Sequence, residues 1–145
     1  MRIKQLIVGM TATVIAISSY VEIAVADLKF PMLVYRTGAY APNGIPNADG
    51  FVDYYKMINA RDGGIGGEKI IHPECETGYK TQVGVECYEK NKKDAMVFQP
   101  MSTGITYQLI PKATNDGVTV YSTGYGRTSA ANGKVFKWIF NAPVT

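Results

Sequence analysis

The chain has 145 residues, 46% of them hydrophobic, and a formal net charge of +3. This length allows a single domain at most. The 15 basic residues are spread along the chain and offset by 12 carboxylates, so we expect no nucleic-acid partner.

The first 26 residues have the pattern of a secretory signal peptide. A basic start, an apolar run and a small-x-small motif follow one another: Arg2 and Lys4, residues 6–20, and Ala24-Val25-Ala26. We therefore expect residues 1–26 to be a signal peptide that is cleaved near Ala26, and residues 27–145 to be exported. A membrane anchor is the alternative, but the run is interrupted by Thr, Ser and Glu22 and is shorter than the ~20 strongly apolar residues of a spanning helix.

The first elements of the exported chain are predicted to be a strand and an amphipathic helix. Residues 28–35 form a short apolar run of strand character, and the stretch TGAYAPNGIPNADG that follows is rich in loop-forming Gly, Pro and Asn. Phe51, Tyr55 and Ile58 recur at helical spacing, so residues 47–60 are predicted to form a helix that buries one stripe. The glycines of RDGGIGG end this helix.

The next segment is predicted to hold a second strand and a second helix. Residues 68–72 have strand character, and Thr81 is a candidate N-cap for a helix with Val83 and Cys87 on one face. Asn91 falls on the same stripe, where an unpaired amide would cost roughly 1–3 kcal/mol. We therefore expect this helix to be rotated or weakened.

Cys75 and Cys87 are the only cysteines of the chain. In an oxidising compartment they can close a disulfide worth roughly 3 kcal/mol, and this is the pairing that we expect. Two buried thiols are the alternative, because spacing in sequence does not bring two Cα atoms close enough by itself. We expect no metal site, since two sulfurs and the distant His72 fall short of four ligands.

Three further strands are predicted at residues 95–99, 118–122 and 135–140. Between the first two of these, Ile105, Leu109 and Ala113 fit a helix that Pro111 should kink or shorten. The alternation of strands and helices predicts an α/β fold, an open parallel sheet with helices on both faces. Ligands of such sheets bind at the carboxyl ends of the strands, where loops are expected at residues 37–44, 99–104 and 123–128.

The loop within FQPMSTGITYQLIPKA, residues 98–113, offers a cluster of hydrogen-bonding groups. Ser102, Thr103 and Gly104 lie where a helix begins, so free backbone N–H groups and two hydroxyls converge near the positive end of the helix dipole. Such a place suits a carboxylate or an amide oxygen. The alternative is that Ser102 or Thr103 caps its own helix.

Signals of an enzyme are weak. The stretch GYGRTS follows a strand as a dinucleotide-binding loop does, but Ser129 replaces its third glycine. Ser102 has no candidate base, because His72 is the only histidine and belongs to a predicted strand. Asp49 and Asp53 fit a solvated helix face. We expect no enzymatic activity and no cofactor, and an oxidoreductase ranks third among the hypotheses.

Five stretches together resemble the type I periplasmic substrate-binding proteins, of the leucine-binding-protein kind. These are LVYRTGAYAPNG, DYYKMINARDGGIGGEKI, ECETGYKTQVGVECYE, FQPMSTGITYQLIPKA and TGYGRT, and the resemblance covers residues 28–145. It implies a periplasmic, solute-binding component of an ABC transporter. Such a protein binds branched-chain amino acids, small amides or urea and works with ABC permease subunits in the membrane.

The resemblance also implies ligand-binding residues. In that family the first lobe holds the carboxylate or amide head of the ligand with the loops after the third and fourth strands. The matching positions here are Ser102, Thr103, Tyr125 and Arg127, and Tyr40 from the first loop is expected to be an aromatic wall. The two tyrosines and Arg127 favour a polar or amide ligand.

Members of the family are roughly two to three times as long, because a second lobe closes over the ligand. We therefore expect residues 27–145 to be an incomplete N-terminal lobe, which alone binds its solute on the order of millimolar, near 4 kcal/mol. The alternative is a truncated, non-binding fragment that self-associates through its unfinished sheet.

Overall fold

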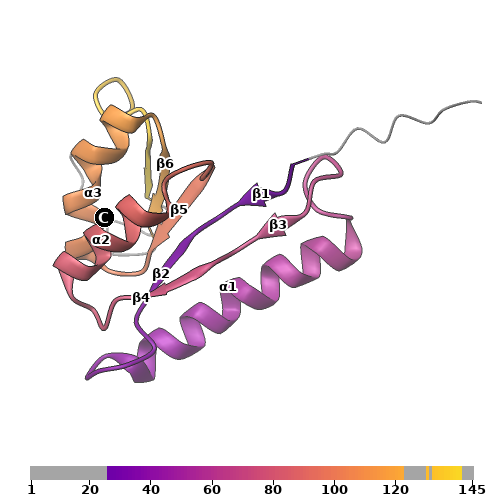
Figure 1. Cartoon of the computed structure of the whole chain (residues 1–145), viewed down its shortest axis with the longest axis horizontal. Helices are drawn as coiled ribbons and strands as arrows, with labels where there is room; N and C mark the ends of the chain where they lie inside the picture. Colours follow the sequence, from indigo (N-terminus) through magenta and orange to yellow (C-terminus); the bar gives the residue numbers. More distant parts are fainter. Residues whose placement is uncertain (1–25, 123–129, 131, 142–145) are drawn as a thin grey trace, which may run out of the picture.

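The computed structural model describes residues 26–122, 130 and 132–141 (Figure 1). Its strands are β1 (Leu28–Lys29), β2 (Met32–Val34), β3 (Ile70–Ile71), β4 (Glu74–Glu76), β5 (Val97–Pro100), β6 (Thr119–Ser122) and β7 (Ile139–Asn141). Its helices are α1 (Ala41–Arg61), α2 (Thr81–Asn91) and α3 (Thr103–Asp116). The predicted α/β fold is confirmed.

The strands form a parallel sheet in the order β4-β2-β5-β6-β7, next to a parallel pair, β1-β3. This pair continues β2 and β4 in one register, because Met32 lies opposite Glu74 just as Leu28 lies opposite Ile70. A proline stands at each break, and proline has no N–H for the ladder. The run predicted as one strand at residues 28–35 is therefore divided, and β4 is a strand that the sequence pattern did not predict.

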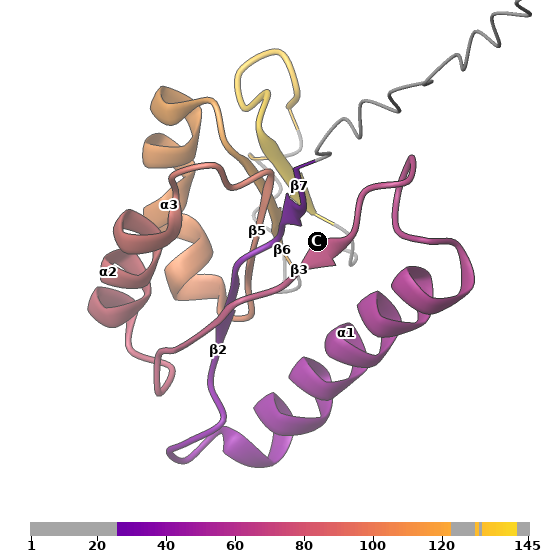
Figure 2. The same cartoon turned by 45° about the vertical axis from the view of Figure 1, so that its right-hand side comes forward.

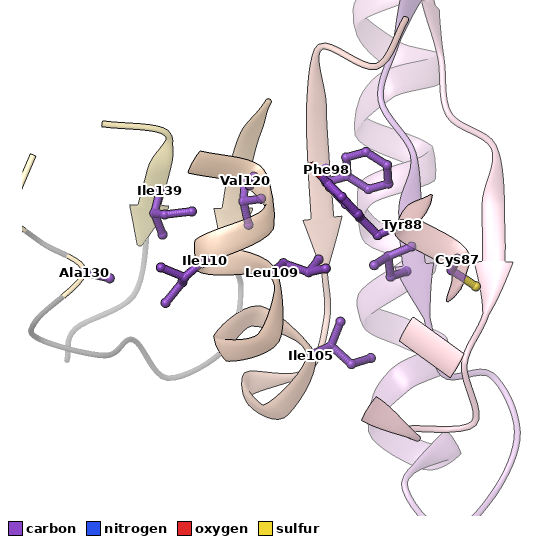
Figure 3. Close-up of a cluster of buried hydrophobic side chains, with 11 residues drawn as sticks. Cys87, Tyr88, Phe98, Ile105, Leu109, Ile110, Val120, Ala130 and Ile139 are labelled. Atoms are coloured by element: carbon purple, nitrogen blue, oxygen red, sulfur yellow. The ribbon is translucent and has the colours of Figure 1, made fainter. Parts of the chain in front are cut away.

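Helices cover both faces of the sheet. Figure 2 shows α2 and α3 together on one side and α1 by itself on the other. Because successive residues of a strand point to opposite faces, Phe98 joins the core under α2 and α3, whereas Val97 and Gln99 face the side of α1. Figure 3 shows the larger core, which includes Tyr88, Phe98, Ile105, Leu109, Val120 and Ile139.

Helix α1 begins at Ala41, six positions before the predicted start, so the prediction of a loop over residues 41–46 was wrong. Its two prolines explain the error. Pro42 lies in the first turn, where a missing N–H costs nothing, and Pro46 lies within the helix. Gly44 is also required here, since a Cβ would lie 2.0 Å from the carbonyl oxygen of Tyr35. Proline and glycine in this segment therefore allow close packing and do not break the helix.

Pro111 was predicted to kink or shorten helix α3. The helix continues through it to Asp116, so the shortening does not occur. The helix ends as the sequence predicts, at Gly117. That residue has a left-handed φ of 67°, and its N–H donates to the carbonyl of Ala113.

Helix α2 is rotated relative to the predicted stripe. It buries Gly84, Cys87 and Tyr88, and the Asn91 amide donates to the carbonyl of Cys87 at 2.8 Å. The expected conflict at Asn91 is therefore absent, since its amide is hydrogen-bonded. Thr81 is the first helical residue and not the cap, because the N-cap is Lys80.

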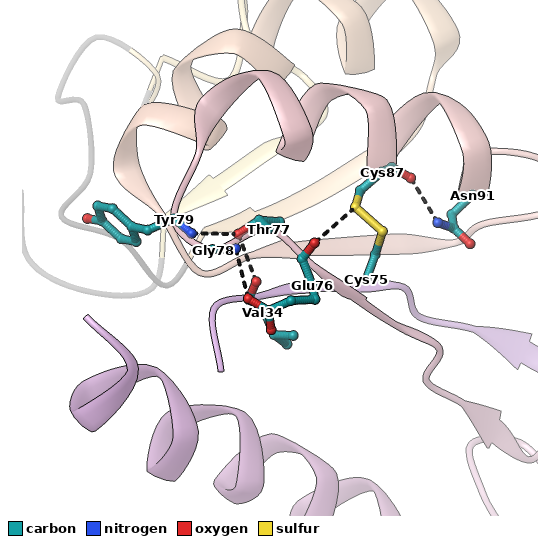
Figure 4. Close-up of a disulfide and its surroundings, with 8 residues drawn as sticks. All are labelled: Val34, Cys75, Glu76, Thr77, Gly78, Tyr79, Cys87 and Asn91. Carbon is teal, nitrogen blue, oxygen red and sulfur yellow. Dashed lines mark hydrogen bonds between the residues drawn. A yellow bond between two sulfur atoms is a disulfide. The ribbon is translucent and has the colours of Figure 1, made fainter. Parts of the chain in front are cut away.

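A disulfide joins Cys75 of β4 to Cys87 of α2, with the two Cα atoms 5.9 Å apart (Figure 4). It ties the first strand in the sheet order to the helix that follows it in the chain. The loop between them, residues 77–80, is thus held at both ends.

The last strand is shorter than predicted. Residues 132–138 form turns, in which the N–H groups of Val135 and Phe136 both donate to the carbonyl of Asn132, and only Ile139–Asn141 pairs with β6. Across the described parts of the chain, no helix has the length and apolar character to cross a membrane. Within the same residues, no cluster of three His, Cys, Asp or Glu side chains could hold a metal ion.

Candidate binding site at the carboxyl edge of the sheet

Because all strand pairs are parallel, the carboxyl ends of β2, β4, β5 and β6 lie at one edge of the sheet. Three described loops leave this edge: residues 35–40 after β2, residues 77–80 after β4, and Met101 and Ser102 after β5. The loop after β6 falls on residues 123–129, so Tyr125 and Arg127 lie outside the described residues.

Ser102 is the N-cap of α3. Its backbone is extended, its side chain is only 2% exposed, and its Oγ accepts a hydrogen bond from the N–H of Ile105 at 3.4 Å. Its carbonyl accepts bonds from both the N–H and the hydroxyl of Thr106, each at 2.9 Å. Ser102 thus has the capping role that the sequence left as the alternative, and its buried hydroxyl holds the start of the helix.

Thr103 and Gly104 are more accessible than Ser102. They form the first turn of α3, before the first intrahelical bond, which the N–H of Thr106 makes. The first turn of α2 lies beside them, since a Cβ on Gly104 would lie 3.0 Å from Oγ1 of Thr81. Two helix N-termini, each with free N–H groups and a positive dipole end, therefore meet at this edge and favour an anionic or carbonyl oxygen.

Tyr40 and Tyr79 form an aromatic wall at the same edge. Their ring centroids are 4.5 Å apart, and the ring of Tyr35 lies edge-on to Tyr79 at 4.8 Å. The Tyr40 side chain is 55% exposed, so one surface of the wall faces solvent. Tyr79 has a left-handed φ of 64°, directly after Gly78 at 54°, a conformation that is costly for a tyrosine.

Tyr79 was not predicted as a site residue, although a repeated sequence pattern marks it. The pair Thr-Gly followed by tyrosine occurs after β2 as TGAY, after β4 as TGY and after β6 as TGY. The first and third copies were recognised as site loops. The second was missed because β4 was not predicted, so residues 77–79 were not placed at a strand end.

Glu76 joins the loops after β2 and β4. Its carboxylate accepts hydrogen bonds from the N–H of Arg36 at 2.8 Å, from the N–H of Gly78 at 2.8 Å and from the hydroxyl of Thr37 at 3.0 Å. Burial raises the pKa of Glu76, but these donors outweigh it, so the pKa lies below its ordinary value. The two loops are therefore held together by an ionised side chain.

Two buried hydroxyls fix the edge from behind. Thr77 donates to the carbonyl of Val34 at 2.7 Å and accepts from the N–H of Tyr79 at 3.2 Å (Figure 4). Thr106 lies 3.2 Å from Ser122, oxygen to oxygen, at the end of β6. Since the Thr106 hydroxyl donates to Ser102, Ser122 is the donor in this pair.

Residues considered for catalysis have structural partners. The ring of His72 packs on Tyr55, with centroids 5.6 Å apart. Asp49 forms an ion pair of 2.7 Å with Arg36, which also binds Glu74. Neither arrangement places a base beside Ser102.

Residues 27–145 match the family model described as periplasmic binding protein. A search of the curated proteins found no match. Among solved structures, a protein described as an ABC transporter permease from the Pseudomonas fluorescens group is 39% identical over 79% of this chain and 29% of its own, with a TM-score of 0.73.

Two more distant structures show the same fold. The branched-chain amino acid transporter substrate-binding protein of Streptococcus pneumoniae, in complex with isoleucine, is 20% identical over 82% of this chain and 34% of its own, with a TM-score of 0.71. A solute-binding protein of an ABC transporter from Rhodopseudomonas palustris, in complex with 3,4-dihydroxybenzoic acid, is 19% identical over 82% and 32%, with a TM-score of 0.67. The chain spans about a third of the length of these structures, and it belongs to the periplasmic binding protein family.

Proposed function

We propose that this chain is the extracytoplasmic solute-binding component of an ABC importer and binds branched-chain amino acids, small amides or urea. The observation that carries the proposal is the meeting of two helix N-termini with an aromatic wall at one edge of the sheet. This edge combines donors for an oxygen-bearing head group with a flat apolar surface beside them.

Each described group has a distinct role in this proposal. The N–H groups at the start of α2 and α3, with the Thr103 hydroxyl, hold the carboxylate or amide oxygen of the solute. Tyr40 and Tyr79 pack against its carbon atoms. Ser102 holds the first turn of α3 in position. Tyr125 and Arg127, in the loop after β6, make further contacts with the solute.

The proposal includes export and delivery. Residues 1–26 act as the signal peptide, the product is periplasmic, and the loaded protein passes its solute to ABC permease subunits. The family match supports the extracytoplasmic location, and the sequence pattern before Asp27 supports cleavage.

The test is a thermal-shift and calorimetric screen of leucine, isoleucine, acetamide and urea. The described edge contacts a solute from one side only, so we expect a Kd of about 1 mM, near 4 kcal/mol. At about ten times this concentration the cognate solute should stabilise the fold by about 1.4 kcal/mol. If none of the four solutes raises the Tm, the proposal is rejected. A micromolar Kd for any of them would reject the expectation of a one-sided contact.

The competing function is a fragment that does not bind solute and self-associates through its sheet. An apolar groove on the α1 side of the sheet favours it, because exposed apolar surface promotes association. Size-exclusion chromatography separates the two: stable oligomers without any solute-induced shift would support the fragment.

A further inference from the structure

The pair Asn-Gly occurs twice in the chain, as Asn43-Gly44 and as Asn132-Gly133. Asparagine followed by glycine is a chemically labile pair, because glycine has no Cβ to keep its peptide nitrogen away from the asparagine side chain. The two pairs lie in different surroundings. The first belongs to the first turn of α1, and the second lies in the turn before β7, which Figure 2 shows in yellow.

The side chain of Asn132 is folded back over the peptide that follows it. Its Oδ1 accepts a hydrogen bond from the N–H of Lys134 at 3.1 Å. The ring that this bond closes contains both the Cγ of Asn132 and the nitrogen of Gly133, so these two atoms are held near each other. The bond also polarises the Cγ carbonyl, whose oxygen takes up negative charge when a nucleophile adds to the carbon.

Gly133 is unrestrained by its surroundings. It is exposed, and a Cβ built on it would meet nothing within 4 Å. Among the residues that the structure describes, none accepts a hydrogen bond from its N–H. A base in the solvent can therefore remove this proton without any opening of the fold.

Gly44 is restrained by both its hydrogen bond and its packing. It is buried, and its N–H donates to the carbonyl of Tyr40 at 3.1 Å. A Cβ on Gly44 would lie 2.0 Å from the carbonyl oxygen of Tyr35, so the peptide has no room to rotate. Reaction at Asn43 requires the first turn of α1 to open, which has a free-energy cost. The same dipeptide is therefore reactive in one place and protected in the other.

We propose that Asn132 is a site of spontaneous deamidation, with the peptide nitrogen of Gly133 as the internal nucleophile. This nitrogen loses its proton to hydroxide and bonds to Cγ of Asn132. The Cγ–Nδ2 bond breaks, and the leaving nitrogen takes a proton from water and departs as ammonia. Water then opens the cyclic imide: addition at Cγ gives aspartate, and addition at the main-chain carbonyl carbon gives isoaspartate. One water is consumed and one ammonia released, and no solute takes part.

The isoaspartyl product alters the turn that leads into β7. The main-chain carbonyl of Asn132 accepts from the N–H groups of Val135 and Phe136, at 3.0 and 2.9 Å. In isoaspartate this carbonyl carbon leaves the main chain and a methylene enters it, so the turn cannot keep its geometry. Phe136 packs against the larger core, and the carbonyl of Trp138 accepts from the N–H of Val120 at 2.8 Å. Isoaspartate therefore loosens the attachment of β7 to β6, whereas aspartate does not.

The test follows both pairs in one sample of the chain. Trypsin releases residues 37–56 with Asn43 and residues 128–134 with Asn132, and chromatography with mass spectrometry measures asparagine, aspartate and isoaspartate in each. In the folded chain we expect Asn132 to deamidate at least about tenfold faster than Asn43, at a rate that rises with hydroxide concentration. In urea the two rates should converge, since unfolding removes the protection of Gly44. Equal rates in the folded chain, or a rate at Asn132 that does not depend on pH, would overturn the proposal.

Two variants test the role of the nitrogen and the effect of the product. Gly133→Ala places a methyl group in open space, so it should leave the Tm unchanged and slow deamidation at Asn132 about tenfold. Asn132→Asp keeps an acceptor for the N–H of Lys134, so its Tm should equal that of the fresh chain. An aged sample rich in isoaspartate should unfold at a lower temperature than both. Deamidation of Gly133→Ala at the original rate would overturn the role of the nitrogen, and an unchanged Tm in the aged sample would overturn the effect on β7.

Discussion

The rings of Tyr40 and Tyr79 lie 4.5 Å apart, although one belongs to the loop after β2 and the other to the loop after β4. The contact brings two loops from neighbouring strands into one surface. Tyr79 reaches it through a left-handed backbone that tyrosine rarely adopts. A packed pair with this conformational cost is expected to serve binding more than stability.

Tyr40→Ala should therefore weaken solute binding about fivefold, near 1 kcal/mol, by removing half of the aromatic wall. The unfolding free energy should change little, because the Tyr40 side chain is 55% exposed. Tyr54→Ala is the matched control, since Tyr54 has the same exposure and lies on the groove side of α1. Calorimetry with the cognate solute measures both, and equal losses in the two variants would contradict the role of the wall.

Ser102 and Thr103 are neighbours with separable roles. Ser102→Ala removes a cap and should lower the free energy of unfolding by about 1 kcal/mol. Thr103→Val removes only the hydroxyl of a partly exposed residue, so stability should stay within about 0.5 kcal/mol while solute affinity falls. Urea denaturation and calorimetry on both variants test this, and a stability loss at Thr103 as large as at Ser102 would contradict the assignment.

The order of strands and helices was predictable because their apolar patterns differ in period. Phe51, Tyr55 and Ile58, for example, recur at the spacing of one helix face. The start of α1 was not predictable, because Pro42, Gly44 and Pro46 are typical of loops. Only the close approach of Gly44 to Tyr35 shows why this segment is helical, and that contact depends on the tertiary structure.

The candidate binding edge was partly predictable for a related reason. Tyr40, Ser102 and Thr103 follow recognisable strands, so parallel pairing places them at one edge. Tyr79 could not be placed, since the three residues of β4 include two glutamates and only one apolar residue, too short a pattern to predict a strand. The groove beside α1 depends on which face of the sheet each helix covers. The periodicity of apolar residues in the sequence does not indicate this.

Replacing both cysteines by serine should lower the free energy of unfolding by roughly 3 kcal/mol. Cys75 and Cys87 join β4 to α2, so their loss also frees the loop that carries Tyr79. Guanidinium denaturation measures the effect. Reductant should destabilise the unaltered chain to the same extent and leave the double variant unaffected, and an unchanged midpoint would argue against the disulfide.

Acid should weaken the contact between the loops after β2 and β4. Burial raises the pKa of Glu76, but the hydrogen bonds from Arg36, Gly78 and Thr37 together lower it by more. The pKa in the folded protein is therefore below its ordinary value. The stabilisation is then complete above the unfolded pKa of about 4.3 and is lost as the pH falls through the folded value. Glu76→Gln should cost about 1 kcal/mol at pH 7 and should flatten the dependence of stability on pH below about 5.

The comparison variant for Glu76 is Glu86→Gln on the exposed side of α2, which should change stability at pH 7 by less than about 0.5 kcal/mol. The pKa values of Glu89 and Asp116 are also lowered, chiefly by hydrogen bonds from Lys112 to Glu89 and from Lys92 to Asp116. Some acid sensitivity must therefore persist in Glu76→Gln. A Glu76→Gln protein with an unaltered pH profile would show that this carboxylate does not hold the loops.

Two glycines of α1 should respond to alanine with opposite signs. A Cβ at Gly44 would lie 2.0 Å from the backbone oxygen of Tyr35, which cannot move aside, whereas a Cβ at Gly50 meets nothing within 4 Å. Gly50→Ala should therefore stabilise the helix by about 0.5–1 kcal/mol. Gly44→Ala should destabilise the protein by about 2 kcal/mol or more and push the start of α1 away from β2. Since Tyr40 directly precedes that helix, Gly44→Ala should also weaken solute binding. Unchanged affinity by calorimetry would show that solute binding does not depend on the position of α1.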